Sequence, residues 1–147
     1  MMRIVRDRWD TNKEELRKVL IEKYGKENCY DYDEIVKVAF KVIFNHVDGL
    51  ELNIDKLVSI DNGDYQGTIL YVIPFDVYQP SECEYFMTYI GYGSCSVCDT
   101  LQGIMDESGK DRIDDLLGLC KDILCNTICP YNYGWRNNPD FDQVEED

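Results

Sequence analysis

The stretch KLVSIDNGDYQGTILYVIPF (Lys56 to Phe75) contains two β-type segments with a turn sequence between them. Valine, isoleucine, threonine, tyrosine and phenylalanine, the residue types enriched in strands, predominate on both sides of DNGD. Asn62 and Gly63 in that turn tolerate the positive φ angles that tight hairpin turns require. We therefore predict a β-hairpin with strands over residues 56–60 and 65–75.

A third strand is predicted over YFMTYIGYG, residues 85–93, which is rich in aromatic and β-branched residues and ends in glycines. It follows the hairpin after only a short loop, VYQPSECE. Neighbouring strands joined by short connections pair antiparallel. The middle of the chain therefore predicts an antiparallel sheet.

Helical periodicity appears on both sides of these strands. TNKEELRKVLIEKYG opens with Thr11 and Glu14 at capping-box spacing and stops at Gly25. DYDEIVKVAFKVIFNHVDG repeats the pattern, with Asp31 and Glu34 at the start and Gly49 as the predicted stop.

Two further helices are predicted after the sheet. A short one follows the segment GSCSVCDTLQ, and DESGKD separates it from a longer one over residues 111–128. The longer helix has an apolar face made of Ile113, Leu116, Leu117, Cys120, Ile123 and Leu124. These elements predict an α+β fold, in which an antiparallel sheet of about three strands packs with about four helices. We expect a single domain over residues 1–147, with a mobile acidic tail at about 137–147.

Charge is distributed unevenly along the chain. Residues 1–56 carry 11 basic and 12 acidic residues, whereas residues 57–147 carry 4 and 17, so most of the net charge of −14 lies in the second part. Between Lys56 and Lys110 there is no basic residue. The acidic residues in this window are Asp61, Asp64, Asp76, Glu82, Glu84, Asp99, Asp106 and Glu107.

A surface of one sign repels nucleic acid and attracts basic proteins. We therefore expect these eight carboxylates to contact a basic protein partner and expect no direct binding of DNA or RNA. The alternative is that the charge serves solubility alone. No apolar run is long enough for a membrane helix, and MMRIVRDRWD is too charged for a signal peptide. These features predict a cytoplasmic protein with no membrane partner.

The seven cysteines are an odd number, which favours thiols or metal ligands over a disulfide framework. Cys95 and Cys98 lie where a strand is predicted to end and a helix to begin. Cys125 and Cys129 lie four residues apart on the predicted last helix. Four thiolates can form a structural tetrahedral zinc site, so these four residues are candidate zinc ligands.

Two other interpretations of the cysteines stay open. Cys95 and Cys98 can act as a redox pair or a nucleophile, because helix N-termini lower thiol pKa values, although thioredoxin-type motifs belong to parallel βαβ units. The simpler interpretation is that they are small packing residues at a tight corner. The sequence has no HExxH motif, phosphate-binding loop, GxGxxG motif or Gly-x-Ser-x-Gly elbow, so we predict no enzymatic activity.

The segments GDYQGT (Gly63 to Thr68) and GYGSCSVCDTLQ (Gly91 to Gln102) together resemble a family of small proteins encoded by bacteriophages and prophages. The resemblance covers about the middle third of the chain, and Val97 stands where a glycine is usual between the cysteines. It implies the cytoplasm of an infected or lysogenic bacterium as the location. Small acidic phage proteins include inhibitors of host defence, among them anti-CRISPR proteins.

The resemblance and the charge together lead to a functional hypothesis. We predict an acidic protein that mimics nucleic acid and inhibits a CRISPR effector nuclease by binding its basic surface. The alternatives are a zinc-stabilised protein-interaction module without mimicry and a thiol-dependent enzyme that uses Cys95 or Cys98.

Overall fold

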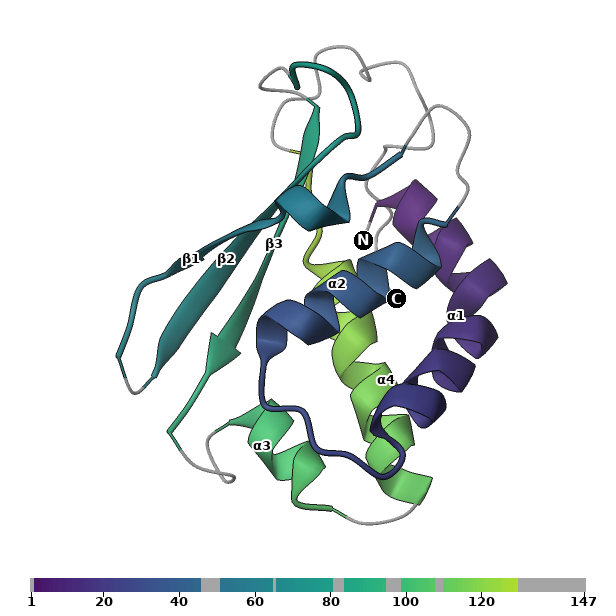
Figure 1. Cartoon of the computed structure of the whole chain (residues 1–147), viewed down its shortest axis with the longest axis vertical. Helices are drawn as coiled ribbons and strands as arrows, with labels where there is room; N and C mark the ends of the chain where they lie inside the picture. Colours follow the sequence, from purple (N-terminus) through teal and green to yellow (C-terminus); the bar gives the residue numbers. More distant parts are fainter. Residues whose placement is uncertain are drawn as a thin grey trace.

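The computed structural model describes residues 2–45, 51–64, 66–80, 84–94, 99–107 and 110–129. Its elements confirm the α+β class, with four helices and a three-stranded antiparallel sheet in this part of the chain (Figure 1). Predictions that concern Glu82, Cys95, Cys98 and residues 137–147 lie outside the described residues. The elements are α1 (Arg3–Tyr24), α2 (Tyr32–Ile43), the 3₁₀ helix η1 (Ile54–Lys56), β1 (Val58–Asp61), β2 (Gly67–Pro74), β3 (Tyr85–Tyr92), α3 (Thr100–Met105) and α4 (Lys110–Cys125).

The sheet has the order β1-β2-β3, and both pairings are antiparallel, as predicted. Its inner face packs against the helices, which lie on one side of the sheet, while α3 lies at the end where β3 stops (Figure 1). Phe86 is fully buried there, and its ring lies 5.5 Å from that of Phe44 and 5.3 Å from that of Phe75. Two buried hydroxyls connect the layers: Tyr71 donates to Asp33 of α2 at 2.6 Å, and Thr88 donates to the Ile123 carbonyl of α4 at 2.6 Å.

Helix α1 begins eight residues before the predicted start, so the capping-box prediction at Thr11 is wrong. Thr11 lies inside the helix, and its hydroxyl donates to the Asp7 carbonyl. The reason is burial, because Val5 and Trp9 in the first turns are almost completely enclosed. Their packing extends the helix beyond the local capping signal. The predicted stop at Gly25 is confirmed.

Helix α2 begins as predicted, with the Asp31 carboxylate accepting from the Asp33 N–H at 2.9 Å. It ends at Ile43, so the predicted stop at Gly49 is wrong. Donors from α1 satisfy the helix end: Arg8 Nε and Asn12 Nδ2 both donate to the Ile43 carbonyl. Because these side chains come from another helix, the α2 sequence does not reveal this end.

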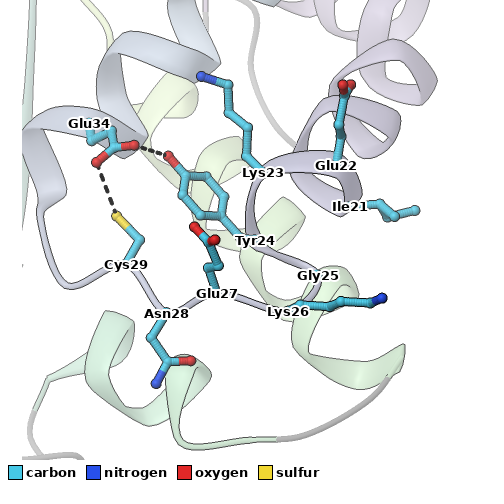
Figure 2. Close-up of a pocket in the computed structure, with 10 residues that line it drawn as sticks. All are labelled: Ile21, Glu22, Lys23, Tyr24, Gly25, Lys26, Glu27, Asn28, Cys29 and Glu34. Atoms are coloured by element: carbon cyan, nitrogen blue, oxygen red, sulfur yellow. Dashed lines mark hydrogen bonds between the residues drawn. The ribbon is translucent and has the colours of Figure 1, made fainter.

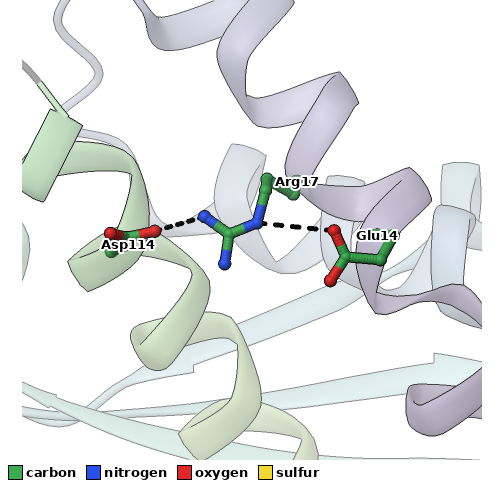
Figure 3. Close-up of polar contacts among 3 residues, drawn as sticks. All are labelled: Glu14, Arg17 and Asp114. Atoms are coloured by element: carbon green, nitrogen blue, oxygen red, sulfur yellow. Dashed lines mark hydrogen bonds and ion pairs between the residues drawn. The ribbon is translucent and has the colours of Figure 1, made fainter.

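The apolar face predicted for the last helix is confirmed, since all six of its residues are buried. The helix ends at Cys125, however, and Ile128 then pairs with Met87 of β3 through an isolated antiparallel bridge. The prediction that Cys129 lies on this helix is therefore wrong. At the surface, Arg17 of α1 contacts both Asp114 of α4 and Glu14, and the bond to Asp114 raises the Arg17 pKa (Figure 3).

Candidate functional site

The connection between β1 and β2 is longer than the predicted tight turn and is held by side chains. The Asp61 carboxylate accepts from the Gly63 N–H at 3.0 Å, and the Asn62 side-chain oxygen accepts from the Thr68 N–H at 2.7 Å. A Cβ on Gly63 would lie 2.0 Å from the Gln66 carbonyl oxygen. Its φ angle lies outside the left-handed region, so the expected positive φ is wrong for Gly63. Close backbone approach requires the glycine.

A tyrosine at the end of β3 reaches this turn. Tyr92 donates its hydroxyl to Asp61 at 2.6 Å. The two residues belong to the two outer strands, and Gly67 of the middle strand pairs with Tyr92. The bond from Tyr92, followed by that from the Gly63 N–H, lowers the pKa of the exposed Asp61 carboxyl. The same bond raises the pKa of Tyr92 to about 12. Asp61 is therefore held as a carboxylate in a fixed position.

Replacing Tyr92 with phenylalanine is expected to raise the pKa of Asp61 toward its ordinary value of about 3.9. Because the folded pKa is lower than the unfolded one, Asp61 contributes stability above pH 4 that is lost as the pH falls through the lowered pKa. NMR titration of the side-chain carboxyl carbon measures the shift directly. The control is Tyr89→Phe, which removes an exposed hydroxyl from the same strand. An unchanged Asp61 pKa in Tyr92→Phe would contradict this assignment.

Asp99 is buried, with 4% of its surface exposed, so the expectation that it belongs to an exposed acidic surface is wrong. Its carboxylate accepts from the Tyr32 hydroxyl at 2.8 Å, the Gly93 N–H at 2.9 Å and the Gln102 N–H at 3.0 Å. The last bond caps α3. Burial, together with the Asp99 bond, raises the pKa of Tyr32, so this hydroxyl stays a donor. The cap was readable in the sequence, because Asp99 and Gln102 have capping-box spacing.

These bonds bring together the two segments that carry the sequence resemblance. The β1–β2 turn, the end of β3 and the start of α3 meet at one end of the sheet. We call this region the tip corner and define it by Asp61, Asp64, Tyr92 and Asp99. Asp61 and Asp64 are exposed, whereas Asp99 fixes the backbone from inside. The tip corner therefore presents two exposed carboxylates beside a network of hydrogen bonds.

The other predicted partner-binding acids do not lie in the tip corner. Asp76 and Glu84 lie at the opposite end of β2, where the Phe75 N–H donates to the Glu84 carbonyl. Eight residues of strand separate the two ends, a distance of about 23 Å. Asp106 and Glu107 lie at the end of α3, and a hydrogen bond with Asp115 raises the Glu107 pKa. The carboxylates thus form separate groups.

Two of the four predicted zinc ligands, Cys95 and Cys98, lie outside the described residues. Among the described residues, no three His, Cys, Asp or Glu side chains are grouped to hold a metal ion. Cys129 follows the Ile128–Met87 bridge and lies beside the first half of β3. Zinc binding itself stays a prediction.

A surface pocket near the end of α1 contains Tyr24, Cys29 and Glu34 (Figure 2). Glu34 accepts from the Tyr24 hydroxyl at 2.8 Å and from the Cys29 thiol at 3.7 Å. Burial raises the pKa of Cys29, which keeps it a thiol at neutral pH. This arrangement does not activate a nucleophile. The thiol-enzyme alternative rests on Cys95 and Cys98 and stays a prediction.

Comparisons with known proteins add no family assignment: no family model matches the chain, and no curated protein or solved structure matches it. None of the helices in the described ranges is long and apolar enough to cross a membrane.

Proposed function

We propose that the protein binds a basic protein surface through the tip corner and thereby competes with nucleic acid for that surface. The observation that carries this proposal is the Asp61 carboxylate, which Tyr92 and the Gly63 N–H hold in place beside the exposed Asp64. Fixed carboxylates lose little side-chain freedom on binding, so they gain more from a cationic partner than flexible ones do. The partner class that fits best is a nucleic-acid enzyme with a basic channel.

Two features support mimicry of a nucleic-acid backbone. The strands and their connections contain no basic residue after Lys56, so no cation of the sheet opposes an approaching basic surface. The tip corner and the Asp76–Glu84 end lie about 23 Å apart. That separation is roughly two-thirds of the axial length of one DNA turn. With the resemblance to phage proteins, these features make a CRISPR effector nuclease the first candidate partner.

The test is inhibition of DNA cleavage by a panel of CRISPR effector nucleases. The test variant combines Asp61→Asn, Asp64→Asn, Asp76→Asn and Glu84→Gln. It is expected to raise the inhibitor concentration needed for half-inhibition by roughly 30-fold or more, because several charge contacts are lost together. Inhibition by the unchanged protein should also weaken as salt increases.

The matched control removes the same number of carboxylates from the exposed side of α1, with Asp7→Asn, Asp10→Asn, Glu15→Gln and Glu22→Gln. Both variants have a formal net charge of −10 in place of −14. Equal inhibition by both variants would show that total charge, not the two ends of the sheet, determines binding. Absence of inhibition against every nuclease in the panel would reject the CRISPR assignment.

A further inference from the structure

The face of the sheet that points away from the helices is apolar on all three strands. The register places Val58, Val72 and Met87 in one cross-strand row and Ile60, Leu70 and Tyr89 in the next. We call these six residues the outer face. Ile128 extends the first row, since it pairs with Met87 on the far side of β3. The rows therefore form one continuous apolar surface.

Much of this surface is accessible. The exposed fractions are 52% for Val58, 54% for Ile60, 51% for Tyr89 and 45% for Ile128. The described helices lie on the other side of the sheet, and among the described residues no element covers the outer face (Figure 1). Contiguous exposed apolar surface of this kind marks an interaction site more often than isolated apolar residues do.

The sequence of β2 is typical of a strand that is buried on both faces, which includes the outer face. Residues 69–73, Ile-Leu-Tyr-Val-Ile, are apolar on both sides of the strand. A strand with one solvated face alternates apolar and polar residues, whereas a continuous apolar run is typical of a strand buried on both faces. Tyr71 and Ile73 are buried against the helices, but Leu70 and Val72 point to the other side. The helices thus cover only one of the two apolar sides of β2.

Edge strand β1 offers hydrogen bonds beside the outer face. It pairs with β2 on one side, and within the described residues no strand pairs with its other side. The side chains of β1 also differ by face: Val58 and Ile60 lie on the outer face, whereas Ser59 and Asp61 lie on the opposite face. A strand added to β1 would meet apolar neighbours on one face and the Asp61 carboxylate on the other.

The apolar outer face and the Asp61 carboxylate define the chemistry of a segment that could bind beside β1. We propose that β1 and the outer face dock an extended segment of a partner protein in which apolar side chains alternate with lysine or arginine. The apolar side chains would cover Val58 and Ile60, and the cations would face Asp61. A second copy of this chain fits less well, because its net charge of −14 would bring acid against acid. The inference deepens the proposed function, on which it rests for the basic character of the partner.

The test measures fluorescence anisotropy of a labelled ten-residue peptide of alternating valine and lysine added to the full-length protein. Peptides of alternating threonine and lysine, and of valine and glutamate, test the apolar and charged requirements separately. We expect binding of the valine–lysine peptide to exceed that of both others by about tenfold or more. Equal binding of the threonine–lysine peptide would overturn the proposal, because charge alone would then explain it.

Variants locate the surface. Val58→Thr combined with Ile60→Thr keeps β-branched residues in the strand and is expected to weaken peptide binding by about tenfold. The control is Ile21→Thr, which changes an equally exposed isoleucine on α1 and should leave binding within about twofold. Tyr89→Thr, on β3, provides a second test that leaves the hairpin unchanged. Unaltered binding by folded Tyr89→Thr and β1 variants would overturn the proposal.

Other occupants give distinct results. If light scattering shows a dimer that Ile60→Thr dissociates, a second copy of the chain lies on the outer face. If a synthetic peptide of residues 130–147 displaces the labelled valine–lysine peptide, a segment of this chain lies there. Either result overturns the proposal. Nuclease inhibition that survives the β1 variants would overturn the docking surface and leave the proposed function standing. Peptide binding without inhibition of any nuclease in the panel would support the docking surface and reject the CRISPR assignment.

Discussion

Replacing Asp99 with alanine is expected to lower the free energy of unfolding by about 4 kcal/mol, which urea denaturation measures. The loss has a specific physical origin. Three donors, the Tyr32 hydroxyl and the N–H groups of Gly93 and Gln102, point at one buried carboxylate. Without it all three donors lose their acceptor, and each donor that stays buried and unsatisfied costs about 1–3 kcal/mol. Faster hydrogen exchange at Gly93 and Gln102 should accompany the loss, because both amides lose their acceptor.

Two further variants separate this role from a simple loss of charge. Asp99→Asn keeps one acceptor oxygen, so it should lose roughly half as much stability as Asp99→Ala. Asp106→Ala removes an exposed carboxylate at the end of the same helix and should change stability by less than about 0.5 kcal/mol. Equal losses for Asp99→Ala and Asp106→Ala would mean that Asp99 does not hold the tip corner.

The strands could be predicted because their information is local. Residue types with high β propensity, interrupted by glycine, mark β2 and β3 to within about two residues. The apolar face of α4 could be predicted equally well, because the helical spacing of its apolar residues determines which side chains are buried. In both cases the residues that determine the element lie inside it.

Helix ends were predicted less well, because distant residues determine them. The start of α1 depends on the burial of Val5 and Trp9, and the end of α2 depends on Arg8 and Asn12. No local signal at Ile43 marks that helix end. Tertiary packing and side-chain donors from a second helix therefore override the capping pattern.

The candidate site shows the same division. Counting acids predicted an acidic surface but could not distinguish exposed Asp61 from buried Asp99, because the difference lies in the donors that surround each one. The outer face could not be predicted for another reason: the apolar run in β2 does not show which side of the strand packs against the helices. Only the pairing register shows that Leu70 and Val72 face away from them.

Gly63→Ala is expected to lower the free energy of unfolding by at least about 2 kcal/mol. The three atoms nearest to the new Cβ all belong to the backbone: the Gln66 carbonyl oxygen at 2.0 Å, its carbon at 2.9 Å and the Gly67 Cα at 3.0 Å. No side-chain rotation relieves these contacts, so the β1–β2 connection must change shape. Asp61 then loses the Gly63 N–H, and partner binding through the tip corner should weaken together with stability.

Gly118→Ala is the matched control, because it adds the same methyl group to a glycine that no neighbouring element crowds. Gly118 is exposed within α4, and beyond the adjacent backbone of that helix its Cβ would meet no atom within 4 Å. Alanine restricts the unfolded chain and favours the helix, so stability should rise by about 0.5–1 kcal/mol. The two substitutions are therefore expected to have opposite signs in the same urea experiment. A neutral Gly63→Ala would show that the turn adopts another shape at no cost, and Asp61 would then lack the fixed position on which partner binding depends.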